Sequence, residues 1–519
     1  MKRLTQWGCV LAVSLLAVPS ARAVGRERVT ETLSERPGRA FDAAGLLAKQ
    51  LRLHGLLVDE RAEAGLERAI TVNFSPAELA ALREPEGRER KLLVGVSKPV
   101  HGAAFNFAGY EGSRGRARAM PYGAIRDQAD GGFSWTTAVR VPGATAVRLR
   151  FDRIFLPGDH ELYVYSEDGQ AYGPYVLRGP QGNRDFWSHT VSGDEVIVQL
   201  RYRPSAGPRP EGNARFVIRE AGYIGDKFKI SRGLTQMAAG FCSFNEPCVE
   251  NVNCTSSPAV ADARDAAAHI LFRSGGSFFI CSGGLLTDTD TNTDRPLFLT
   301  ANHCISKGRE ASSMEAFFQF DTRCGGACYD PDGVVPSTVG SSILAKNRTS
   351  DYTLLELSES APRGSAFMGW NSLPVAFSNG TSLFRVSHPA GAPQAYSEHS
   401  VDTGAGTCGG WPRGNWIYSA DTLGATEGGS SGSPVVNSSG QVVGQLTGAC
   451  GTNVNDPCDS AANATVDGAF AAYFPSIESI LDPGSGGTCT LGQVGDPCNS
   501  NGDCCSNKCR GRRGSKTCR

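Results

Sequence analysis

Three residue types that together hydrolyse amides stand far apart in this chain. His303 ends the apolar segment "FLTANHC", Asp351 opens "SDYTLLEL", and Ser431 lies in "GGSSGSP". A histidine can take the proton of a serine hydroxyl, while a buried carboxylate orients the imidazole and stabilises its cation. The three residues in this order predict nucleophilic attack on a carbonyl group through an acyl-enzyme intermediate.

The segment around Ser431 has two other interpretations. Runs of Gly and Ser are typical of flexible linkers. The stretch 428–432 also fits G-x-S-x-G, the nucleophile elbow of an α/β-hydrolase, with Ser430 as nucleophile. That fold needs its histidine after the serine, and the last histidine of the sequence is His399. Chain order therefore excludes the elbow.

Short strands are expected to carry the three residues. Residues 240–482 show short apolar runs and many glycine turns, which indicate an all-β domain. One helix is expected near its end, in "AAYFPSIESILDP", where Tyr473, Ile477 and Ile480 share a face.

A second β-rich region precedes this domain. In "AVRLRF", Val147 and Leu149 alternate with Arg148 and Arg150, which predicts a strand with one buried face. Further strands around an Asp168-Gly169 turn favour a small β-sandwich over about 133–225. Residues 24–130 are charged and partly helical, with a helix start expected at Ser75-Pro76-Ala77-Glu78.

The N-terminus and the cysteines indicate export. Residues 1–23 combine a basic start, a short apolar run and the A-x-A sequence 21–23, the pattern of a cleaved signal peptide. Sixteen of the 17 cysteines follow this segment, and none lies within 24–241. We expect a secreted, extracellular protein with disulfides and no stable membrane insertion. The net charge of −1 gives no reason to expect a nucleic-acid partner.

The last 31 residues form a separate unit. Residues 483–488 are expected to be a linker, and 489–519 hold six cysteines, too short a segment to fold on an apolar core alone. The adjacent pair Cys504-Cys505 resembles a knottin, whose pattern implies the disulfides Cys489–Cys505, Cys498–Cys509 and Cys504–Cys518. This basic module suggests a possible surface or polyanion as a partner, although a solvated cap is an equal alternative.

The strongest resemblance covers roughly 240–482. The segments "CSGGLL…FLTANHC", "SDYTLLEL", "SHPAG" and "TEGGSSGSPVV…GQLTG" resemble the bacterial lysyl-endopeptidase branch of the chymotrypsin-like serine proteases. Residues 133–225 resemble the propeptide sandwich of such secreted proteases. The resemblance implies an all-β fold: a double six-stranded antiparallel β-barrel with the triad between the barrels. A propeptide at 24–236 would precede a protease domain at 237–482.

The resemblance also implies roles for single residues. His303 would be the base, Asp351 its orienting group and Ser431 the nucleophile, with the backbone N–H groups of Gly429 and Ser431 as the oxyanion hole. Protein or peptide substrates are expected to pair with an edge segment at Leu446, Thr447 and Gly448. No cofactor or metal is expected.

Specificity is less clear from the sequence. Ala425 stands where trypsin keeps its pocket acid, and Thr465 stands where the lysyl-specific branch keeps one. A small alignment shift would place Asp467 in the pocket and favour Lys or Arg at P1, the substrate residue before the cleaved bond. Without that shift a small or medium apolar P1 is favoured, and the sequence leaves both options open.

Disulfides in the protease domain are assigned by resemblance. Cys281–Cys304 is the first expectation, followed by Cys242–Cys450 and Cys248–Cys324. The partners of Cys254, Cys328, Cys408 and Cys458 stay open.

One position departs from the trypsin pattern. Ser430 replaces the aspartate that pairs with a new N-terminus in trypsin-like zymogens, so activation by N-terminal insertion is not expected. Removal of the propeptide, which would be a partner of the enzyme before activation, is expected instead. The alternative function is a catalytically inactive, secreted binding or adhesion protein with the same fold.

Overall fold

The computed structural model describes residues 25–32, 40–83, 91–107, 120–204, 213–230, 244–290, 294–325 and 334–483. It also gives the backbone of two paired strands in the tail, β30 (Cys509–Arg512) and β31 (Ser515–Cys518). The proposed signal peptide, the expected propeptide end at 236 and the three tail disulfides lie outside the described residues. Within the described part, no helix is both long and apolar enough to cross a bilayer.

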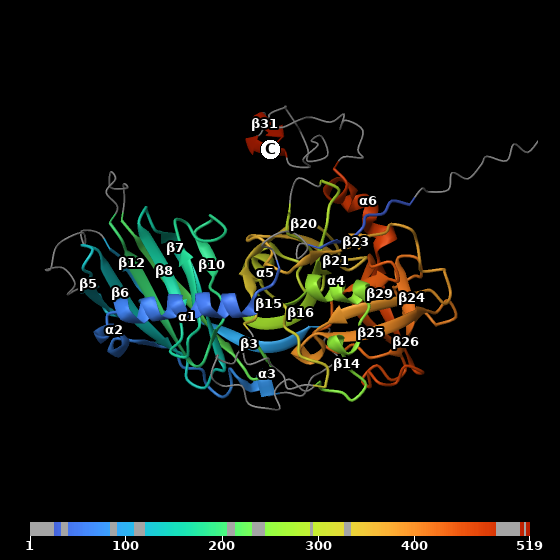
Figure 1. The fold of residues 1–519 in the computed structure, drawn as a ribbon, viewed down its shortest axis with the longest axis horizontal. Coiled ribbons are helices and arrows are strands. Elements are labelled where there is room, and N and C mark those ends of the chain that lie inside the picture. Colours follow the sequence, from blue (N-terminus) through green and yellow to red (C-terminus); the bar gives the residue numbers. More distant parts are fainter. Residues whose placement is uncertain are drawn as a thin grey trace, which may run out of the picture.

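A β-sandwich forms the N-terminal half (Figure 1). One of its sheets contains β2 (Ile70–Thr71), β5 (Ala124–Asp127), β6 (Phe133–Arg140), β8 (His160–Tyr165), β9 (Ala171–Tyr175) and β12 (Glu195–Tyr202). The other contains β3 (Leu92–Pro99), β4 (Ala104–Asn106), β7 (Ala146–Phe155), β10 (Asp185–Trp187), β11 (Val191–Ser192) and β13 (Arg215–Ile224). The sandwich therefore begins well before residue 133, the start expected from the sequence.

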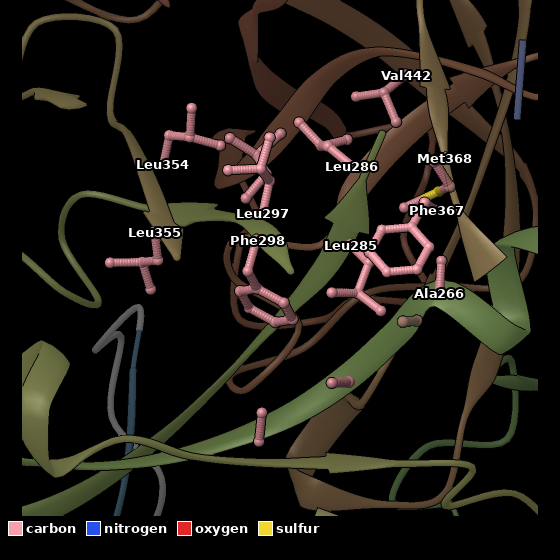
Figure 2. Close-up of a cluster of buried hydrophobic side chains, with 14 of the residues drawn as sticks. Ala266, Leu285, Leu286, Leu297, Phe298, Leu354, Leu355, Phe367, Met368 and Val442 are labelled. Carbon is pink, nitrogen blue, oxygen red and sulfur yellow. The ribbon is translucent and has the colours of Figure 1, made fainter. Parts of the chain in front are cut away.

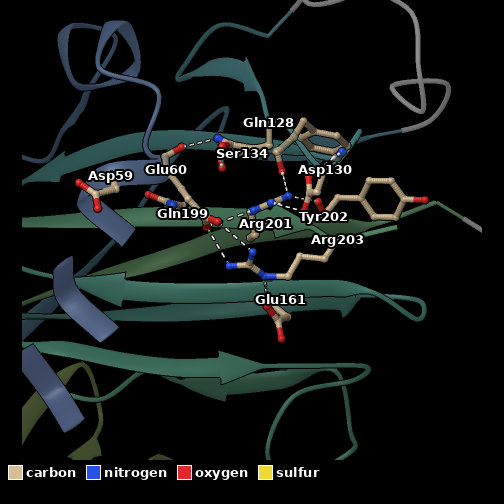
Figure 3. Close-up of polar contacts among 12 residues, drawn as sticks. Asp59, Glu60, Gln128, Asp130, Ser134, Glu161, Gln199, Arg201, Tyr202 and Arg203 are labelled. Atoms are coloured by element: carbon tan, nitrogen blue, oxygen red, sulfur yellow. Dashed lines mark hydrogen bonds and ion pairs between the residues drawn. The ribbon is translucent and has the colours of Figure 1, made fainter. Parts of the chain in front are cut away.

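Three helices accompany the sandwich: α1 (Ala43–Glu60), α2 (Ala64–Glu67) and α3 (Ala80–Arg83). The carboxylate of Asp42 caps the start of α1 by accepting the N–H of Gly45 at 2.8 Å. At the other end of α1, Glu60 accepts hydrogen bonds from Arg201 at 3.1 Å and from Arg203 at 2.8 and 2.9 Å (Figure 3). These charge-assisted bonds fix the end of α1 on the sheet that contains β12.

The first barrel follows the sandwich along the chain. Its strands are β15 (Ala267–Ser274), β16 (Ser277–Leu286), β17 (Leu297–Ala301), β18 (Glu315–Phe318), β19 (Ser337–Val339), β20 (Ser341–Asn347) and β21 (Tyr352–Leu357). β19 pairs with β18 and β20 pairs with β21, so the bent run 337–347 closes a six-membered ring. Gly340 makes the bend at a φ of 82°, a conformation that favours glycine.

The second barrel is a closed ring of six strands. They are β24 (Ser382–Ser387), β25 (Ala395–Val401), β26 (Trp416–Leu423), β27 (Pro434–Asn437), β28 (Gln441–Gly451) and β29 (Asn463–Ala469), and pairing of β25 with β26 closes the ring. The short strands β14 (Glu250–Asn251) and β23 (Gly369–Trp370) join its sheet. The two barrels are thus the all-β architecture that the sequence predicts.

Apolar side chains from both barrels meet in one large core (Figure 2). Leu285, Leu297 and Leu354 come from strands of the first barrel, and Val442 comes from β28 of the second. The terminal helix α6 (Phe470–Leu481) buries Tyr473 and Ile477 in this core, as its periodicity predicts. Two further helices, α4 (Pro258–Ala266) and α5 (Gly308–Ser313), and the short turns η3 (Val252–Cys254) and η4 (Pro389–Gly391) complete the domain.

The sandwich and the first barrel share one sheet. β3 pairs with β13 of the sandwich on one edge and with β16 of the barrel on the other (Figure 1). A common apolar core joins the two units, with Trp187 and Phe228 packing with Phe278 and Phe317. At the N-terminus, β1 (Glu31–Thr32) pairs with β22 (Ala366–Phe367) beside the barrels. The segment expected to be a propeptide is therefore integrated into the fold of the barrels.

The position of Arg148 differs from the alternation of buried and exposed side chains expected for β7. It was expected to face solvent, but it is fully buried between the sandwich and the barrel. Its guanidinium donates to the carbonyl oxygens of Ser188 and Ser313, each at 2.8 Å, and lies 3.3 Å from the buried carboxylate of Glu315 on β18. The barrel covers the face of β7 that an isolated sandwich would expose.

Candidate active site

Paired strands bring His303 and Asp351 together. β17 and β21 are antiparallel, with Ala301 opposite Tyr352, so the turn after β17 meets the residue before β21. Asn302 donates its N–H to the carbonyl oxygen of Asp351 at 2.8 Å. One strand pair thereby brings together a histidine and an aspartate that are 48 positions apart in the sequence.

The Asp351 carboxylate is buried and accepts three hydrogen bonds. Its Oδ1 accepts the backbone N–H of His303 at 2.8 Å, and its Oδ2 lies 2.7 Å from His303 Nδ1. The hydroxyl of Thr447 donates to the same Oδ2 atom at 2.9 Å. Because a carboxylate is only an acceptor, His303 Nδ1 carries a proton, and in the neutral imidazole Nε2 then holds the lone pair. Among the described residues, the buried Nε2 atom has no hydrogen-bond partner.

Ser431 lies beside this pair on the loop from β26 to β27. Its carbonyl oxygen accepts the N–H of Ser282 at 2.8 Å and lies 3.8 Å from Cys304 Sγ, next to His303. The neighbouring Gly432 packs so tightly that an added Cβ would lie 2.6 Å from the backbone nitrogen of Ala301. The second barrel thus places Ser431 against the end of β17 in the first barrel.

The loop before Ser431 has a fixed backbone. Gly429 has a φ of 100°, and its carbonyl oxygen accepts the Ser282 hydroxyl at 2.9 Å. An added Cβ at Gly429 would lie 2.8 Å from the carbonyl oxygen of His388, so both conformation and space require glycine. The Gly429 N–H donates to no described residue.

Ser430 has a structural environment. It is fully buried, and its hydroxyl accepts a hydrogen bond from Ser387 at 3.0 Å. His388 is also buried, with Nδ1 3.0 Å from the carbonyl oxygen of Ala392, and burial lowers its pKa to about 4. Both residues shape the loop around Ser431.

Thr447 has a role that the sequence did not indicate. It was expected in an edge segment that pairs with the substrate backbone, and its buried side chain donates a hydrogen bond to Asp351. Gly448, by contrast, has open space where a side chain would stand. The backbone of Leu446 is bonded to Gly432 and Ser433, and beyond Leu446 the described strand β28 pairs only with β29, so its other edge is available beside Ser431.

Asp467 cannot serve as a free pocket acid. It is fully buried and forms a bidentate ion pair with Arg385 at 2.8 and 2.9 Å. Ala425 packs in a small apolar cluster with Val249 and Ala395. Thr465 is buried, and its hydroxyl donates to Asp421 at 2.7 Å. A carboxylate that sequence reasoning missed, Asp421, therefore lies beside one of the three expected pocket positions.

Four disulfides lie in the described part of the two barrels and the segments beside them: Cys281–Cys304, Cys248–Cys458, Cys254–Cys324 and Cys408–Cys450. The first was expected. The expectations Cys242–Cys450 and Cys248–Cys324 are wrong, because Cys450 at the end of β28 meets Cys408 with a Cα separation of 5.9 Å. Cys324 meets Cys254 beside η3 at 4.8 Å. The sulfurs next to His303 are bonded to each other and offer no thiolate to a metal.

Comparisons with known proteins agree with this geometry. A family model described as "Lysyl endopeptidase, C-terminal domain" matches residues 244–461. A lysyl endopeptidase of Pseudomonas aeruginosa is 28% identical over 334 residues, which cover 62% of this chain and 69% of the relative. This chain is a serine endopeptidase.

Other similarities are weaker. A protein of Plasmopara viticola named "Secreted RxLR effector protein 73" is 24% identical over 317 residues, covering 58% of this chain and 73% of the relative. Two solved bacterial proteases are similar over parts of the chain. The HtrA-type protease AlgW has a TM-score of 0.32 and 16% identity, covering 43% of this chain and 62% of its own. The Rv3671c protease of M. tuberculosis has a TM-score of 0.31 and 13% identity, covering 46% and 92%. At these TM-scores the structural similarity decides neither fold nor function.

Proposed function

We propose that this chain is the precursor of a secreted endopeptidase that cleaves peptide bonds through His303, Asp351 and Ser431. The observation that carries the proposal is the 2.7 Å contact of His303 Nδ1 with Asp351, which leaves the lone pair of the buried Nε2 beside the Ser431 loop. The 244–461 family match supports the same assignment.

The chemical steps follow from these positions. His303 Nε2 takes the Ser431 proton while Oγ attacks the peptide carbonyl, and the N–H groups of Gly429 and Ser431 stabilise the oxyanion. The imidazolium then protonates the leaving amine, which departs and leaves an acyl-enzyme. A water molecule, deprotonated by the same imidazole, hydrolyses the ester and restores Ser431. Asp351 stabilises the imidazolium in both halves of the reaction.

Substrate would bind along the open edge of β28. An extended peptide can add a strand to such an edge, with backbone hydrogen bonds to alternate residues of the segment from Thr447 to Ala449. The open space beside Gly448 supports this position. The carbonyl to be attacked would then lie at Ser431, where the β26–β27 loop approaches β28 through the bond from Gly432 N–H to Leu446 O.

We propose the following organisation for the precursor: signal peptide at 1–23, propeptide at 24–236, protease domain at 237–482, linker at 483–488 and a knottin-like module at 489–519. The shared sheet and the buried Arg148–Glu315 pair imply that cleavage near 236 alone leaves the sandwich bound. The main role of the propeptide would then be to support folding of the first barrel. The basic module would contact a surface or polyanion.

A fluorophosphonate probe tests the central step, because it reacts with an activated serine. The secreted protein, after removal of the propeptide, should be labelled, and Ser431→Ala should abolish labelling. Ser433→Ala is a matched control, since the Ser433 hydroxyl is buried two residues away and has no hydrogen-bond partner among the described residues. Labelling that survives Ser431→Ala would place the reactive nucleophile at another residue, and no labelling of the processed protein would favour the inactive binding protein.

A further inference from the structure

A second buried network lies inside the second barrel, close to the proposed catalytic residues. Arg385 on β24 contacts both Asp467 on β29 and His399 on β25, and His399 contacts Asp421 on β26. Arg385, Asp467 and His399 are almost completely buried, whereas 14% of the Asp421 side chain is exposed. The proposed mechanism uses none of these four groups.

Hydrogen-bond directions assign the charges in this network. Arg385 is always protonated, and its Nε donates to His399 Nε2 at 2.9 Å. Nε2 must therefore hold a lone pair, so the proton sits on Nδ1 and is donated to Asp421 Oδ1 at 2.6 Å. His399 is neutral in this arrangement. Arg385 and Asp467 cancel, and the remaining negative charge belongs to Asp421.

The Asp421 carboxylate is held at one oxygen and available at the other. Both of its hydrogen bonds, from His399 and from the Thr465 hydroxyl, end on Oδ1. Oδ2 accepts none within the part of the chain that the structure describes. Two rigid donors therefore fix the carboxylate while a second oxygen stays available to a cation.

Strand register places this carboxylate on the substrate side of the barrel. Thr465 pairs with Ser419 on β26 and with Ala449 on β28, so the three side chains share a face. Asp421 lies two residues after Ser419 and therefore has the same orientation. The nucleophile loop begins directly after β26, and Thr447, which binds Asp351, is two residues before Ala449. The P1 side chain of a peptide on β28 would enter between these elements.

Ser419 supplies an independent sign of a ligand. It is fully buried, and its hydroxyl has no hydrogen-bond partner among the described residues. A buried hydroxyl without a partner is costly unless a ligand satisfies it. An ammonium or guanidinium group between Asp421 Oδ2 and this hydroxyl would satisfy both groups.

We propose that Asp421, fixed by His399 and Thr465, is the specificity-determining residue of this protease and selects a cationic side chain, Lys or Arg, at P1. The proposal rests on the proposed endopeptidase function. Asp421 takes the pocket role for which the sequence offered three other positions. Asp467 is neutralised by Arg385, and Ala425 and Thr465 carry no charge. Asp421 reaches the pocket from β26, and it is not among the three pocket positions expected from the sequence.

The test profiles P1 preference with matched peptide substrates for the secreted protein, Asp421→Asn and Glu398→Gln. The native protein should prefer Lys or Arg. Asp421→Asn should lower kcat/KM for these substrates by about 100-fold or more, because it removes one partner of a desolvated charge pair. Substrates with a small apolar P1 should change much less. Glu398 lies beside His399 but faces solvent, so Glu398→Gln should keep the native profile.

Each outcome decides the matter. A native preference for apolar P1, or a basic preference that Asp421→Asn leaves as strong as Glu398→Gln does, would overturn the role of Asp421 while fluorophosphonate labelling still supports a protease. Absence of labelling in the native protein would overturn the proposed function and this inference with it. Labelling of Asp421→Asn at Ser431 would show that the variant is folded, so a selective loss on basic substrates supports the proposal.

Discussion

The second barrel and the interface between the barrels each hold a largely buried histidine–aspartate pair, and the two pairs are built alike. His303 Nδ1 lies 2.7 Å from Asp351, and His399 Nδ1 lies 2.6 Å from Asp421. In each pair a threonine hydroxyl from a neighbouring strand also donates to the carboxylate. Both carboxylates therefore orient an imidazole through the same kind of bond.

The pairs differ at the other ring nitrogen. Arg385 donates to Nε2 of His399, whereas Nε2 of His303 has no partner among the described residues. An imidazole that faces a permanent cation cannot accept another proton, but one with an available lone pair can act as a base. The same dyad thus supports proton transfer in one place and a fixed negative charge in the other.

The largest expected effect comes from removing the base with the available lone pair. His303→Ala should lower kcat on the order of 10⁶-fold with little change in KM, since it removes the proton acceptor from Ser431. Steady-state hydrolysis of a peptide ester or amide measures kcat and KM for this comparison. Loss of less than about 10²-fold would mean that His303 and His399 do not differ in the way described.

Asp351→Asn should lower kcat by roughly 10⁴-fold, because an amide would favour the wrong tautomer of His303. The matched change in the other pair, Asp421→Asn, should instead act on substrates with basic P1. Comparison of kcat and KM for both variants with one basic and one apolar substrate separates the roles. Equal, substrate-independent losses in kcat would remove the distinction between the pairs.

Arg385→Met tests the cation that separates the two pairs. It leaves Asp467 buried without its counter-ion, so the free energy of unfolding should fall by about 3–5 kcal/mol. Arg385→Met combined with Asp467→Leu should recover much of this loss. Denaturant unfolding measures both, and a double variant no better than the single one would show that the ion pair is not the cause.

Thr447→Val should have a smaller effect. It removes one hydrogen bond to the Asp351 carboxylate, worth about 1.5–3 kcal/mol to a charged group, and should lower kcat roughly 10- to 100-fold. Thr447→Ser keeps the hydroxyl and should restore most activity. Failure of serine to rescue would point to packing of the threonine methyl group instead.

The last prediction concerns the pH dependence of P1 preference, where we expect no change over a wide pH range. Burial pushes the pKa of Asp421 upward, but hydrogen bonds from His399 and Thr465 and the charge of Arg385 outweigh it, so the net pKa lies below its ordinary value. The carboxylate therefore stays charged above its usual pKa of about 4, and its contribution is lost only as pH falls through the lower folded value. The ratio of basic to apolar P1 cleavage should be constant from about pH 8 to 5. A ratio that changes within this range would contradict the account.

Local sequence signals predicted the elements that carry the proposed catalytic residues. Apolar strands before His303 and after Asp351, the glycines around Ser431 and the face of α6 were all visible as short patterns. Chain order alone removed the elbow interpretation. These features depend on neighbouring residues, so the sequence holds enough information to find them.

Contacts between distant segments could not be predicted in this way. Arg148 appeared to face solvent because alternation in β7 says nothing of the barrel that covers it. Asp421 is separated from Thr465 by 44 residues and becomes a pocket candidate only through the β26–β29 pairing. The disulfide errors have the same origin, since cysteine partners depend on which loop ends meet in space.

Peptide mapping of the fluorophosphonate adduct tests the central claim most directly, because three serines lie within four residues of the same loop. The account predicts a single adduct on Ser431, with Ser430 and Ser433 unmodified and no adduct in His303→Ala at matched exposure. An adduct on Ser430, or equal labelling when His303 is absent, would contradict it.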